Sequence, residues 1–145
     1  MISLVSLAFG AVLSTVATTQ PLPSTQQGYY DLGQEFANCS AHQALAAFVA
    51  DRSGLEETTT MAKDRARGWK FAGMVFLAEG LDPTDRSQTE RTFDGMVRVK
   101  LEELKARYDG GGDAPKTAIP QEYAKACSPL LPLQEMVIAM IGRTG

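Results

Sequence analysis

The chain is poor in the residues that most often bind metals and cofactors. Its 145 residues include two cysteines and one histidine. Cys39 and His42 have a spacing found in some metal sites, but a tetrahedral zinc site needs about four ligands and no second cluster of such residues follows. The spacing also differs from the Cys-x-x-Cys-His motif that attaches haem covalently. We therefore expect no metal site and no cofactor.

Catalytic motifs are also missing. A Ser-His-Asp site would have to use His42, and no serine lies in a Gly-x-Ser-x-Gly sequence or a comparable strand-turn-helix context. Neighbouring carboxylates occur only in segments with the pattern of charged helix surfaces, so nothing indicates a carboxylate held in an apolar pocket. These absences predict that the protein is not an enzyme.

Neither sign of charge dominates, and the chain has no run of basic residues. Its 14 basic and 17 acidic residues give a net charge of -3, which excludes the strongly basic surface of a typical nucleic-acid-binding domain. Hydrophobic residues make up 44% of the chain and charged residues 21%, as in globular domains rather than in disordered chains or proteins with several membrane spans. The length allows one domain.

Charged residues are absent before Asp31. Residues 2–16 form an apolar run followed by small residues, a pattern typical of a secretory signal peptide, and the run is shorter than the ~20 residues of a membrane-spanning helix. We expect a signal peptide over residues 1–17, a flexible leader over 18–28 and one helical domain over 29–145. No Lys or Arg precedes the run, and Thr15 is a poor residue three positions before a cut at Ala17. The alternatives are an uncleaved anchor, which would be the only contact with a membrane, and a misassigned start codon.

The two cysteines permit a single intramolecular disulfide, between Cys39 and Cys127. Disulfides persist in oxidising compartments and are rare in the cytosol. The even cysteine count therefore agrees with export and predicts a periplasmic or secreted protein. A crosslink that closes so long a loop stabilises the fold by roughly 4 kcal/mol in the chain-entropy model.

The apolar residues recur at helical spacing, and no strand-like alternation of useful length occurs. The short connections favour an all-α, antiparallel four-helix bundle, with the disulfide between its first and last helices. The expected helices cover residues 30–54, 56–79 and 83–108, followed by a closing segment with a short helix over 119–127 and a longer helix over 129–141.

Glycines mark two further features of this bundle. Residues 109–115 include three consecutive glycines and are expected to form a mobile loop. Gly68 and Gly73 lie inside the second expected helix, where glycine lowers helix propensity by about 1 kcal/mol relative to alanine. We expect that a neighbouring helix approaches closely at these positions.

Two groups of side chains are candidate sites. The first is a polar stripe at helical spacing on the first helix, which either faces one ligand or forms a solvated surface: Asp31, Glu35, Asn38 and His42. The second is a candidate pocket or partner surface, in which methionines could bind soft metals but are better explained as core filling: Gln43, Trp69, Phe71, Met74, Tyr108, Tyr123, Met136 and Met140.

Residues 71–78 and 130–141 contain more apolar side chains than one buried seam requires. Surplus apolar surface is typical of a partner site. The first functional hypothesis is therefore an exported domain that binds another envelope protein or a peptide, as an inhibitor, an immunity protein or a chaperone. The alternatives are a small-ligand or metal carrier with a pocket inside the bundle and an accessory subunit of an envelope assembly. Gln43 discriminates between the first two, because a carrier requires this side chain to point into a cavity rather than to bond a neighbouring backbone group.

Overall fold

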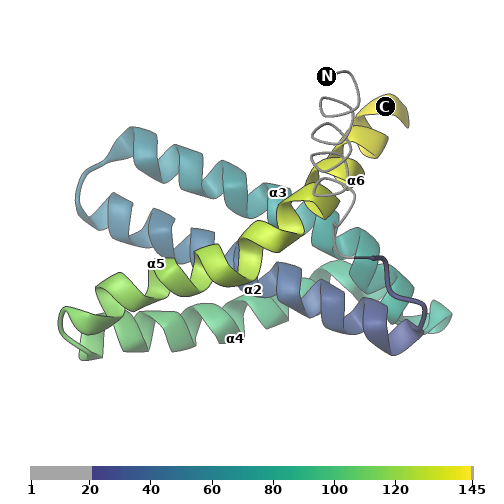
Figure 1. Ribbon diagram of the computed structural model, residues 1–145, viewed down its shortest axis with the longest axis horizontal. Coiled ribbons are helices and arrows are strands. Elements are labelled where there is room, and N and C mark those ends of the chain that lie inside the picture. Colours follow the sequence, from purple (N-terminus) through teal and green to yellow (C-terminus); the bar gives the residue numbers. More distant parts are fainter. Residues whose placement is uncertain (1–20, 145) are drawn as a thin grey trace, which may run out of the picture.

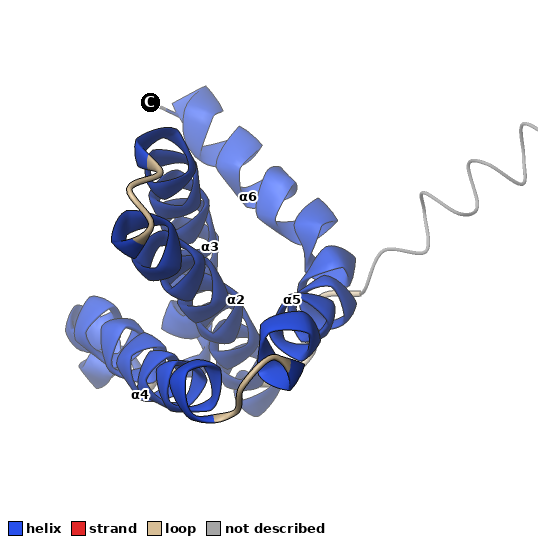
Figure 2. Ribbon diagram, turned by 90° about the vertical axis from the view of Figure 1, so that its left-hand side faces the viewer, coloured by secondary structure: helices blue, strands red, loops and turns tan. Residues whose placement is uncertain are grey.

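The computed structural model describes residues 21–144. The expected signal peptide and residues 18–20 of the expected leader lie outside the described residues. Within these limits the chain is helical almost throughout and has no strand, so the all-α prediction is confirmed (Figure 2). None of the described helices is both long and apolar enough to cross a membrane.

The helices form four consecutive segments that alternate in direction (Figure 1). Helices α2 and α3 form an antiparallel hairpin, and α4 runs back alongside α2. The fourth segment begins as α5, bends at a single 3-10 turn and continues as α6, which packs on α3. The described elements are α2 (Gln26–Arg52), α3 (Glu56–Gly80), η1 (Pro83–Gln88), α4 (Thr89–Gly110), α5 (Ala114–Cys127), η2 (Ser128–Leu130) and α6 (Leu131–Thr144).

The predicted disulfide joins the first of these segments to the last. Cys39 lies in the middle of α2 and Cys127 is the last residue of α5, and their Cα atoms are 5.9 Å apart. Both cysteines are buried. The crosslink therefore encloses α3 and α4 in one covalent loop, and the prediction of a helical bundle crosslinked between its first and last segments is confirmed.

An aromatic core lies where α2 crosses α3. The ring of Phe36 in α2 packs against Trp69 and Phe76 of α3, with ring centroids 5.3 and 5.2 Å apart. Phe93 of α4 joins the same buried cluster. A smaller cluster fastens α5 to α2 and α4 nearer the other end of the bundle, through Ala41, Leu45, Leu104 and Ile119.

The leader predicted up to residue 28 is too long, because α2 begins at Gln26. Thr25 caps the helix: its hydroxyl oxygen accepts a hydrogen bond of 3.0 Å from the backbone N–H of Gly28. Such a cap satisfies one of the free N–H groups of the first turn and favours an earlier helix start. Residues 26–28 therefore belong to the helical domain.

The predicted glycine loop is also shorter than expected. Helix α4 continues to Gly110 and α5 starts at Ala114, which leaves residues 111–113 as the connection. The N–H of Gly111 still donates to the carbonyl of Arg107, and Gly112 makes the turn with a φ of 69°. Pro115 then fits the first turn of α5, where its fixed φ suits a helix. As a result Pro120, expected at the start of a helix, lies inside one.

Candidate functional site

A half-open groove lies between the tips of the α2–α3 and α4–α5 hairpins, and we call it the inter-hairpin groove. Its volume is about 520 Å³, inside the ~300–1,000 Å³ range of small-ligand pockets. Its apolar lining consists of Leu45, Ala46, Val49, Ala50, Leu55, Ile119 and Pro120. Its polar lining consists of His42, Gln43, Ser53, Thr58, Arg65, Tyr108, Lys116 and Tyr123.

The groove exists because the fourth segment bends away from the first half of α3. Helix α6 packs on α3 at Gly68, where an added Cβ would lie 3.0 Å from Nε2 of Gln134. Helix α5 instead packs on α2 and α4 through Ile119. The inward face of α2 is therefore covered around Cys39 but open farther along, where Ala46 is exposed although it shares that face.

Gln43 is the clearest polar feature of the groove. The residue is only 7% exposed, and its side chain makes no hydrogen bond with any other described residue. The Gln43 amide is not among the fully buried polar atoms that lack a partner, so it is accessible from the groove. Its amide lines the groove rather than bonding a neighbouring backbone group, which is the arrangement that a ligand carrier requires.

His42 forms part of the inner end of the groove. Its ring packs against Tyr123, with centroids 5.7 Å apart, and its Nδ1 atom is buried without a hydrogen-bond partner among the described residues. Burial lowers the pKa of His42, and the positive charges of Lys100 and Arg107 lower it further, against the opposing effect of Glu122 and Glu103. His42 is therefore neutral at pH 7 and can accept or donate one hydrogen bond to a molecule in the groove.

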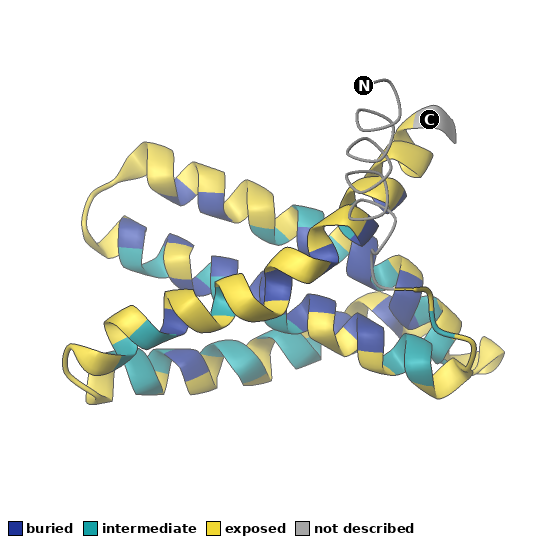
Figure 3. Cartoon of the chain, viewed as in Figure 1, coloured by how far each residue is buried: buried dark blue, intermediate teal, exposed yellow. Residues whose placement is uncertain are grey.

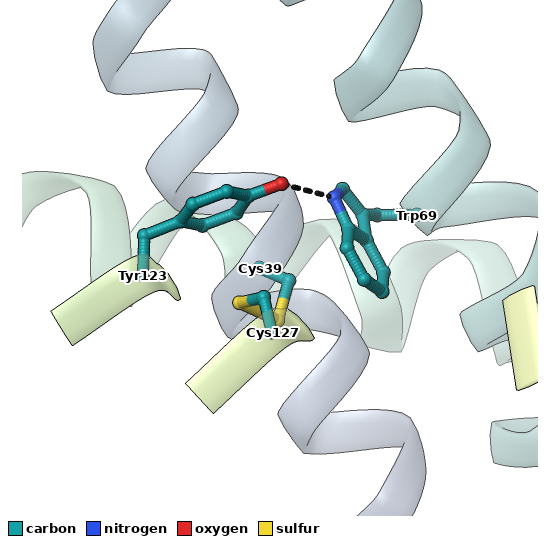
Figure 4. The surroundings of a disulfide bond; sticks show 4 residues. All are labelled: Cys39, Trp69, Tyr123 and Cys127. Atoms are coloured by element: carbon teal, nitrogen blue, oxygen red, sulfur yellow. Dashed lines mark hydrogen bonds between the residues drawn. A yellow bond between two sulfur atoms is a disulfide. The ribbon is translucent and has the colours of Figure 1, made fainter. Parts of the chain in front are cut away.

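The disulfide holds the inner end of the groove in place (Figure 4). His42 follows Cys39 by one helical turn, and Tyr123 precedes Cys127 by one turn. The indole Nε1–H of Trp69 donates to the hydroxyl oxygen of Tyr123 over 3.1 Å. These contacts position the Tyr123 ring between His42 and the core.

The charges that line the groove are all basic. Arg65 reaches it from α3 and Lys116 from α5, and no Asp or Glu of the described chain lines it. Neither side chain forms an ion pair within the described part of the chain; the Lys116 ammonium instead lies 5.4 Å from the centre of the Tyr108 ring. The groove is thus locally basic in a protein of net charge -3.

The polar stripe expected on α2 does not converge on one ligand. Asp31 and Glu35 are exposed, and Asp31 accepts a hydrogen bond of 2.9 Å from the amide of Gln27. Burial and the neighbouring Asp31 raise the pKa of Glu35. Asn38 lies in a separate shallow depression beside α4, whereas His42 lines the inter-hairpin groove. No group of three or more potential metal ligands occurs among residues 21–144.

The second candidate set divides into three parts. Gln43, Tyr108 and Tyr123 line the groove. Trp69 is only 1% exposed, belongs to the core and does not line the groove; Met74 packs partly against the same core. The remaining three lie on the outer surface of α3 and α6, where exposed residues predominate (Figure 3): Phe71, Met136 and Met140.

Arg65 and Lys116 were missed by the sequence reasoning. No acidic residue lies three or four positions from Arg65, but the same holds for Lys63 and Lys70 in the same helix. Lys70 pairs with Glu90 and Asp94 of α4 instead. The local sequence therefore gives no signal that singles out Arg65.

Comparisons with protein-family models, with curated proteins and with solved structures find no match to this chain.

Proposed function

We propose that the protein binds a small, largely apolar molecule in the inter-hairpin groove and acts as its carrier. The observation that carries this proposal is the apolar groove of about 520 Å³ itself, on whose wall the Gln43 amide makes no hydrogen bond within the described chain and is accessible to a ligand. Ligand sites characteristically combine an apolar lining with a few polar groups that orient the ligand. The groove matches this description in volume and in lining.

The disulfide supports a carrier that works outside the reducing cytosol. Cys39–Cys127 lies one helical turn from His42 and Tyr123, which line the groove, and is a single crosslink of the kind that persists in the periplasm or after secretion. Because it fixes α5 against α2, it keeps the groove open and preformed. Preorganisation of this kind reduces the entropy lost when a ligand binds.

Filling the groove tests the proposal. Ala46 is exposed inside the groove on the body of α2, so Ala46→Phe adds a ring that occupies the ligand space while leaving the core unchanged. We expect this variant to bind a neutral, polarity-sensitive dye about tenfold more weakly or worse, the equivalent of ~1.4 kcal/mol, in a fluorescence titration. Ala106→Phe on the exposed side of α4 is the matched control and should bind as the parent protein does. Equal dye affinities for the two variants would remove the groove as the binding site.

A second candidate function, binding of another envelope protein or a peptide, is favoured by the outer surface of α3 and α6. Phe71 is 59% exposed and Val75 lies one turn along the same stripe of α3. On α6 the exposed side chains include Leu131, Met136 and Ile138. Exposed apolar residues that lie together are typical of interaction surfaces. An accessory subunit of an envelope assembly would use this surface in the same way.

This second function is separable from the first by mutation. Phe71→Asp combined with Met136→Asp should abolish crosslinked partner capture from envelope extract, because a partner would have to bury two carboxylates. The dye affinity of the groove should not change. Val99→Asp is the control, since Val99 is 71% exposed on α4, away from this surface. Partner capture that survives the double substitution would argue against an interface at α3 and α6.

A further inference from the structure

We propose that the ligand of the inter-hairpin groove is an amphipathic anion, a medium-length aliphatic chain that ends in a carboxylate. This inference rests on the proposed function and adds the chemical class of the ligand. Its basis is the pairing of an apolar lining with charged side chains that, among residues 21–144, are all basic. An anion is attracted into such a groove, and its desolvation is offset by hydrogen bonds from charged and amide groups.

The position of the headgroup follows from the register of α2 and α3. The hydroxyl of Ser40 donates to the carbonyl of Ala66 over 3.0 Å, which sets these two residues opposite each other. Arg65 precedes Ala66 and Gln43 follows Ser40 by three residues, so both lie within about one helical turn of this contact. Both line the groove. A carboxylate at this level receives N–H donors from the Arg65 guanidinium and from the Gln43 amide.

The chemistry of these two residues matches a carboxylate. A guanidinium presents parallel N–H groups to a planar carboxylate and remains charged at every relevant pH. Gln43 makes no hydrogen bond within the described chain and its amide is accessible from the groove, so its N–H groups are free to donate to the headgroup. Arg65 has no carboxylate partner within the described chain, so no ion pair has to break when the anion binds.

The aliphatic chain extends from this point toward the hairpin tips. The lining there is apolar and comes from both hairpins, chiefly Val49, Ala50, Leu55 and Ile119. Lys116 also lines the groove, with its ammonium 5.4 Å from the centre of the Tyr108 ring, and adds to the positive potential. Each buried methylene should tighten binding about fourfold until the chain outgrows the groove.

Displacement of the neutral dye by decanoate and by decanol at low ionic strength tests the inference. We expect decanoate to bind about tenfold to a hundredfold more tightly than decanol, because a charged hydrogen bond contributes that much. Arg65→Gln should reduce the affinity for decanoate to that for decanol. The affinity for decanol should not change. Arg91→Gln is the matched control, an exposed arginine on α4 outside the groove, and should change neither affinity. Octanoate, decanoate and dodecanoate measured below their micelle-forming concentrations should follow the fourfold step per methylene.

The outcomes separate this inference from the function on which it rests. Equal affinities for decanoate and decanol, or equal weakening of both by Arg65→Gln, would overturn the anionic ligand. If Ala46→Phe still blocks both compounds in that case, the groove remains an apolar ligand site. If neither compound displaces the dye and Ala46→Phe does not change dye binding, both the proposed function and this inference are wrong.

Discussion

Removal of the Cys39–Cys127 crosslink should lower the free energy of unfolding by about 4 kcal/mol, because the crosslink closes a loop of 88 residues and restricts the unfolded chain. A small domain is stabilised by about 5–15 kcal/mol in total, so the loss is a large share. Urea unfolding of the oxidised and the reduced protein measures it. The reduced protein keeps both cysteine side chains in the core, so the comparison isolates the crosslink from packing.

The same experiment has a consequence for the groove. His42 and Tyr123 lie one turn from the two cysteines and form the inner end of the groove. Without the crosslink, α5 is held on α2 mainly by the small cluster around Ile119. We therefore expect the reduced protein, under conditions where it is still folded by circular dichroism, to bind the neutral dye more weakly. The double variant Cys39→Ala, Cys127→Ala should behave likewise under oxidising conditions. Equal stability of the oxidised and reduced forms would contradict the role given to the disulfide.

Most of the fold follows from local patterns in the sequence. Apolar residues at helical spacing indicate each long helix, and two cysteines allow one pairing, so the bundle and its crosslink are both predictable. The errors lie at helix ends, where short-range contacts decide. Thr25 caps α2 earlier than the apolar pattern begins, and Gly112 makes a tighter turn than the glycine-rich composition suggests.

The site was less predictable, because it depends on which helix faces remain uncovered. Ala46 and Gln43 share the inward face of α2, and periodicity alone places both in the core. Whether that face is covered depends on the bend between α5 and α6, which the sequence marks by Ser128 and Pro129 without specifying its direction. Conversely, Trp69 was expected at a pocket or partner surface but is buried, because Tyr123 from α5 satisfies its indole N–H inside the bundle.

The sequence predicts close helix contacts at Gly68 and Gly73, and the contact at Gly73 is the tighter of the two. A Cβ added there would lie 2.7 Å from Cβ of Phe36 in α2 and would clash with the Phe93 ring from α4. Both aromatic residues are completely buried, so neither can move aside without opening the core. Close approach of the neighbouring helices at Gly73 is therefore confirmed, whereas at Gly68 the nearest atom belongs to the flexible end of Gln134.

Gly73→Ala should accordingly destabilise the protein by about 3 kcal/mol, since overpacking of a filled core outweighs the ~1 kcal/mol gained from the helix propensity of alanine. Gly95→Ala is the matched control in α4: a Cβ there meets no atom within 4 Å, so this change should stabilise the protein by about 0.5–1 kcal/mol. Urea unfolding midpoints should shift in opposite directions for the two variants. A stabilising effect of Gly73→Ala would mean that α3 is not pressed between Phe36 and Phe93, and the helix spacing on which the core depends would have to be wrong.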